Sequence, residues 1–220
     1  MWIPSLDRYR KIQIQDVVEP KMAENGEARV KKLLKATNSG GKSDAILGSS
    51  VYVTLAVPII ALIAALLSGS LLLLDYVHVL TGGTWTGIDL FMGLVMSRVM
   101  RGLSPQSRAE IIKKLVPIML FFMPALASVA ITGGIYLANH EELSFLSTPI
   151  IIAIIIVAIL SIQGFGLILP NEVRILLELR KTNPDTEKIV KLGMRNIYFS
   201  GSQAIFQIAI IFVMAYLAVG

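Results

Sequence analysis

The lysine and arginine residues of this chain are confined to blocks that alternate with long apolar stretches. All 20 fall in three blocks, which run over 8–42, 98–114 and 174–195. The stretches free of Lys and Arg lie at 46–97, 115–138, 147–170 and 197–220. Positive charge near a spanning segment resists translocation, so such blocks mark the cytoplasmic side of a membrane protein. We therefore predict a multi-pass protein of the cytoplasmic membrane whose basic blocks all lie inside.

The length of the apolar stretches predicts how often the chain crosses the membrane. A bilayer core about 30 Å thick takes about 20 apolar residues per helix. The stretch 46–97 is too long for one crossing and too short for three, and Ser68-Gly69-Ser70 offers a break within it. We predict an all-α bundle of about five spans, at 46–67, 71–97, 115–138, 147–170 and 197–219. Two crossings then separate successive basic blocks, which puts the N-terminus in the cytoplasm and the C-terminus outside.

The first 45 residues are predicted to form a polar cytoplasmic arm ahead of a transmembrane domain at 46–220. A short basic helix is expected at 27–36, with Val30, Leu33 and Leu34 on one side. This amphipathic pattern is typical of a helix on anionic lipid or of a docking surface, and a solvated connector is the alternative. We expect a homo-oligomer or a subunit of a membrane complex. Nothing beyond the net charge of +5 favours nucleic-acid binding.

The predicted second span carries polar side chains on one face. Asp75, His78, Trp85 and Asp89 fall within an arc of about 80° on a helix with about 100° per residue. Charged groups inside a bilayer are costly, so these residues must face other helices, and they mark function by default. No Lys or Arg in any span can neutralise Asp89. We expect it to be protonated or bonded to one of four polar residues, which are Gln163, Gln207, Thr132 and Ser128.

Histidines, carboxylates and thioethers along this face suggest a path for a metal ion. His140 and Glu141 follow the third span and lie near the same outer face as His78. Imidazole and carboxylate groups suit Cu(II) or Zn(II), and thioethers suit Cu(I). The predicted metal ligands are His78, His140, Asp75 and Glu141 near the outer face, followed inward by Met92, Met96 and Met100. Met119 and Met123 on the third span could face this row, although packing is the alternative for all the methionines.

The same region resembles a known family. The run from His78 through Trp85 to Gly87 is similar to the His-x6-Trp-x-Gly signature of membrane proteins of the copper resistance protein D type and their uncharacterised relatives. The resemblance covers about 70–220 and implies copper uptake across the cytoplasmic membrane; some relatives are suspected of haem binding. It carries over only to His78 and Trp85. This chain has fewer predicted spans than larger members and no recognisable extracellular copper-binding domain.

Three functions follow from these observations. The first, which we favour, is a copper permease or its subunit. The second is a redox subunit that holds haem b between His78 and His140, near Trp85, since two imidazoles can ligate haem iron. The third is a non-catalytic subunit of a larger membrane complex. No nucleophile with a neighbouring base appears in the sequence, so an enzyme acting alone is not expected.

Overall fold

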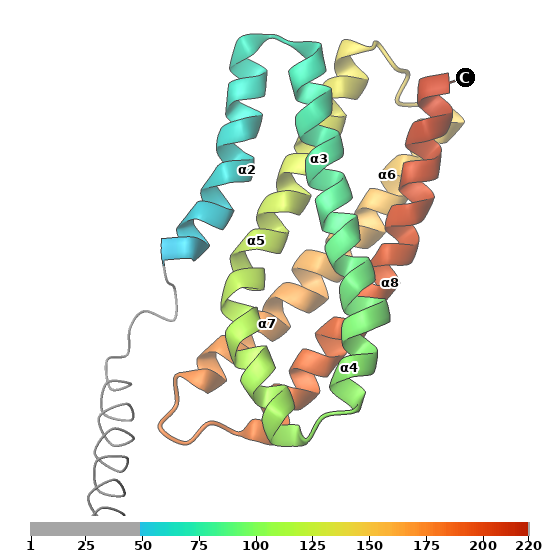
Figure 1. The fold of residues 1–220 in the computed structure, drawn as a ribbon. Coiled ribbons are helices and arrows are strands. Elements are labelled where there is room, and N and C mark those ends of the chain that lie inside the picture. The colour runs from blue at the N-terminus through green and yellow to red at the C-terminus, as the bar shows by residue number, and fades with distance from the viewer. Residues whose placement is uncertain (1–48, 220) are drawn as a thin grey trace, which may run out of the picture. The chain divides into compact units, whose positions relative to one another are not determined.

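The computed structural model describes residues 49–219, and the predicted N-terminal arm with its basic helix lies outside this part of the chain. All regular structure in the described residues is helical, and the long helices run side by side (Figure 1). The helices long and apolar enough to cross a membrane are Leu71–Arg101, Pro105–His140, Thr148–Leu179 and Thr186–Leu217, and a shorter apolar helix covers Leu55–Ser68. The predicted all-α, multi-pass membrane fold is confirmed.

Two of the long helices contain a short stretch of π-helix, in which each backbone hydrogen bond spans five residues and not four. In chain order the elements are α2 (Ser49–Ser68), α3 (Leu71–Leu90), η1 (Phe91–Met96), α4 (Ser97–Arg101), α5 (Pro105–His140), α6 (Thr148–Ser161), η2 (Ile162–Ile168), α7 (Leu169–Leu179) and α8 (Thr186–Val219). The α3–η1–α4 and α6–η2–α7 segments are each continuous. The sequence did not predict either π-helical stretch.

Local chemistry explains where the helices break. The chain leaves α2 through Gly69, whose φ of 63° suits a residue without a side chain. The Ser70 hydroxyl then accepts a hydrogen bond from the Leu73 backbone at 3.3 Å and caps α3. Ser104 caps α5 in the same way through Ser107 N–H at 3.2 Å, and Pro105 occupies the first turn. The break expected at residues 68–70 is therefore the observed one.

The Lys and Arg residues of the described helices lie around the connections at one end of the bundle. The α2–α3 turn, the α5–α6 loop and the end of α8 lie together, and the α4–α5 and α7–α8 connections lie at the opposite end (Figure 1). The basic blocks 98–114 and 174–195 surround these last two connections. We call this the basic end, and its cytoplasmic placement remains the prediction of the positive-inside rule.

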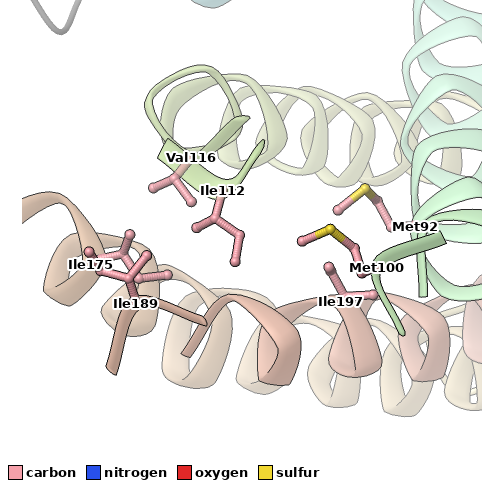
Figure 2. Close-up of a cluster of buried hydrophobic side chains, with 7 residues drawn as sticks. All are labelled: Met92, Met100, Ile112, Val116, Ile175, Ile189 and Ile197. Carbon is pink, nitrogen blue, oxygen red and sulfur yellow. The ribbon is translucent and has the colours of Figure 1, made fainter. Parts of the chain in front are cut away.

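Three clusters of buried apolar side chains hold the described helices together. The inner cluster lies toward the basic end and consists of Met92, Met100, Ile112, Val116, Ile175, Ile189 and Ile197 (Figure 2). The outer cluster lies nearer the opposite end and consists of Trp85, Leu126, Ala127, Ala130, Ile156 and Leu160. The third attaches α2 to α3 and α5 and consists of Leu62, Ala65, Leu74, Val77, Val129 and Leu137.

Candidate functional site

The predicted outer metal ligands do not form one group in the structure. The side chains of Asp75, His140 and Glu141 are exposed, and that of His78 is half-buried. Within residues 49–219 no three His, Cys, Asp or Glu side chains come close enough together to hold a metal ion. His140 and Glu141 lie where α5 ends, and Asp75 lies near the start of α3, so no neighbouring helix covers them.

His78 has a defined orientation against α5. Its Nδ1 lies 2.7 Å from the carbonyl oxygen of Ala130. Because a carbonyl oxygen can only accept, Nδ1 carries the proton, and Nε2 of the neutral ring keeps a free lone pair. The ring packs on two glycines: a Cβ at Gly134 would lie 2.9 Å from Cε1 of His78, and one at Gly133 would lie 3.1 Å from its Cβ. The glycine pair therefore makes room for the imidazole.

Deeper in the bundle lies a partly open cavity, which is lined by residues of α3, η1, α5, α6, η2, α7 and α8. The volume of this cavity is about 70 Å³. That is room for a few water molecules or for one small ion. Its polar lining residues are Trp85, Asp89, Glu172, Asn196, Ser200 and Gln203. No Lys, Arg or His is among the described residues that line it, so the cavity combines acids and neutral amides without a positive side chain.

Asp89 is the most deeply buried acid of the described chain, at 0% exposure. Its Oδ2 accepts a hydrogen bond of 2.9 Å from Nε2 of Gln207 on α8. Gln207 is thus the partner observed among the four expected. The Ser200 and Trp85 side chains also lie near this carboxyl group. Oδ1 of Asp89 has no hydrogen-bond partner among the described residues, and a buried acceptor in that state costs free energy until a proton or a cation reaches it.

Glu172 on α7 supplies a second buried carboxyl group to the same cavity. Its exposure is 6%, and it lies close enough to Asp89 for the two acids to interact electrostatically. Two acids in a space without a positive side chain favour the uptake of positive charge. Glu172 was not among the predicted site residues, because it lies beyond the predicted span at 147–170. In the structure α7 continues from η2 without a break and turns this residue inward.

The methionines divide between the cavity and the core. Met92 lines the cavity together with Met119 and Met123, which are one helical turn apart on α5. Met100, by contrast, is fully buried in the inner cluster, and Met96 packs partly buried against that cluster. Of the predicted row Met92, Met96 and Met100, only Met92 therefore lines the cavity that holds the two acids. The facing pair on the third span adds two more.

Amide side chains of α8 fix the η2 stretch that forms one wall of the cavity. Gln203 Nε2 donates to the carbonyl oxygen of Leu160, just before η2, at 3.0 Å. Asn196 Nδ2 donates to that of Ile168, at its end, at 3.1 Å. The Asn196 side chain is held in turn by Asn171, whose Nδ2 donates to its Oδ1 at 2.9 Å. π-helical turns are frequent at functional sites, and here both of them border the cavity. Gln163, also on η2, has a buried Oε1 to which no described residue donates a hydrogen bond.

Comparisons with known proteins do not indicate a function for this chain. No protein-family model, no curated protein and no solved structure matches this chain. The resemblance of the His78–Gly87 run to the copper resistance protein D type therefore remains a prediction. The acid- and thioether-lined cavity and the oriented His78 are the two features from which chemistry can be argued.

Proposed function

We propose that this protein binds copper(I) in the cavity at the centre of the bundle and passes it across the membrane, alone or as a permease subunit. One observation supports the proposal most directly. Asp89 and Glu172 line the same cavity as Met92, Met119 and Met123, and no Lys, Arg or His is among the described residues that line it. The copper ion is the substrate of this process and not a resident cofactor.

The donor set favours copper(I) over other cations. Thioether sulfur is a soft ligand that suits Cu(I), and carboxylates supply the negative charge that an ion needs inside a membrane. Magnesium and calcium prefer all-oxygen sites. Structural and catalytic zinc sites are built largely from thiolate and imidazole ligands, and neither is found among the described residues that line the cavity. Neutral thioethers also hold an ion loosely enough for it to leave again, as conduction requires.

The test is copper(I) binding by the purified protein under reducing conditions, measured by competition with a chromogenic copper(I) chelator. Met123→Leu removes a cavity thioether, and Met100→Leu removes one from the inner cluster. We expect Met123→Leu and Asp89→Asn to weaken binding by about tenfold or more, within the range seen when a metal site is disturbed. Met100→Leu should leave the affinity unchanged. A parent protein without bound copper, or equal losses in both methionine variants, would refute the proposal.

A second candidate function is favoured by the orientation of His78. With Nδ1–H donating to the carbonyl oxygen of Ala130, Nε2 is suited to ligate a haem iron. A hydrogen bond from the other ring nitrogen commonly orients a histidine that ligates a metal. His78 would hold the haem iron through Nε2, whereas His140, the other predicted ligand, lies exposed at the end of α5. When bound, haem would supply one-electron chemistry. A visible spectrum of protein produced with ample haem decides the matter, because a Soret band that His78→Ala abolishes supports this function and its absence excludes it.

A further inference from the structure

Apolar side chains bound the cavity at both ends. Toward the basic end it shares Met92, Ile112 and Ile197 with the inner cluster. Toward the opposite end it shares Trp85, Ala127 and Leu160 with the outer cluster. These shared residues place apolar side chains between the acids and each end of the bundle. An apolar constriction is a known way to stop ions.

One contact in the inner cluster is unusually close. The side chain of Ile112 on α5 points toward α8 (Figure 2) and is only 2% exposed. It rests against Gly193: a Cβ added to this glycine would overlap Cδ1 of Ile112 and lie 2.8 Å from its Cγ1. Ile112 thus fills a notch in α8 that exists only because residue 193 has no side chain. Ile112 and Gly193 both line the cavity.

We propose that Ile112, seated on Gly193, is the gating residue that separates the cavity from the basic end and controls exchange of the ion with the cytoplasm. Transfer of a charge past an aliphatic side chain in a dry constriction is costly. Withdrawal of Ile112 from its notch would let water reach Ser200 and the two acids. The inference rests on the proposed function for the identity of the ion, but the closure itself can be measured without copper.

The chain contains no cysteine, so one introduced thiol can report alone on access to the cavity. Ser200→Cys places a thiol of similar size on the cavity wall. The measured quantity is the rate at which a membrane-impermeant cationic methanethiosulfonate modifies this thiol in vesicles of known orientation. Closed structures open to a minor population of about 0.1–10%, so removal of the gate should raise the rate about tenfold or more. We expect this rise in Ile112→Ala, with reagent at the basic end only.

Two further variants keep the test decisive. Ile118→Ala, on the same helix but 37% exposed, removes the same atoms away from the cavity and should leave the rate unchanged. Gly193→Ala fills the notch from the α8 side and should raise the rate even though the isoleucine remains. A second reporter, Ala127→Cys, should give the same order of rates. The gate would be refuted if the thiol of Ser200→Cys, with Ile112 and Gly193 in place, already reacts fast with reagent at the basic end. It would also be refuted if neither Ile112→Ala nor Gly193→Ala raises the rate. If the parent protein binds no copper(I) but the modification rates follow this order, only the proposed function is refuted.

Discussion

The hydrogen bond between Gln207 and Asp89 allows a quantitative test of how α3 and α8 are joined inside the membrane. Gln207→Leu keeps the approximate volume of the side chain but removes the donor that lies 2.9 Å from Asp89 Oδ2. Both residues are almost fully buried, at 2% and 0% exposure. No other hydrogen bond from the described residues replaces the lost donor, so neither oxygen of the carboxyl group keeps a protein partner.

The expected cost follows from this burial. Interhelical hydrogen bonds in membranes contribute about 0.6 kcal/mol on average and up to about 1.7 kcal/mol. A bond to a charged group and a stranded buried acceptor both raise the cost, to about 1.5–3 kcal/mol in proteins generally. We expect Gln207→Leu to lower the free energy of unfolding by about 1–2 kcal/mol. Asp89→Leu strands the amide of Gln207 and should also destabilise the protein. The double variant, which leaves neither group unpaired, should cost less than the sum of the two.

The assay is equilibrium unfolding of the parent, both single variants and the double variant in mixed detergent micelles. The four free energies form a double-mutant cycle whose coupling term isolates the pair. We expect a favourable coupling of about 1 kcal/mol, within the range measured for such bonds in membranes. Independent substitutions add within about 0.3–0.5 kcal/mol, so a coupling no larger than that would refute the argument that this bond joins α3 to α8.

Two other predictions concern the packing around the cavity. A Cβ at Gly93 on η1 would overlap the backbone of Gly201 on α8, so Gly93→Ala should destabilise the protein by about 1–3 kcal/mol. Gly87→Ala on α3 is the control: nothing lies within 4 Å of an added Cβ there, so the thermal midpoint should change little. Asn196→Leu removes the 3.1 Å bond to Ile168 and strands Asn171, which should cost about 1–3 kcal/mol in the same unfolding assay. Asn183→Leu, in the exposed α7–α8 connection, is the matched control and should be neutral.

Amino-acid order alone was enough to predict the class of this protein. The spacing of the three basic blocks indicated membrane helices and their ends, because charge and apolar length act locally and need no knowledge of partners. The break at Ser68-Gly69-Ser70 was equally visible, since it depends on a few neighbouring residues. The inward face of the second span could be read from its helical period, which singled out Trp85, Asp89 and Met92 correctly as residues of the interior.

Only the tertiary structure decided which of these groups meet. Asp75, Glu141 and His140 belong to the same outer region as His78 along the sequence, yet the ends of α3 and α5 leave them exposed. Glu172 lies beyond the predicted span at 147–170, and only the continuous α6–η2–α7 segment brings it close to Asp89. A helical period gives the direction of a side chain on its own helix, but not the height or the rotation of the neighbouring helix. Those depend on contacts between distant residues, such as Ile112 on Gly193 and the amides of α8 on η2.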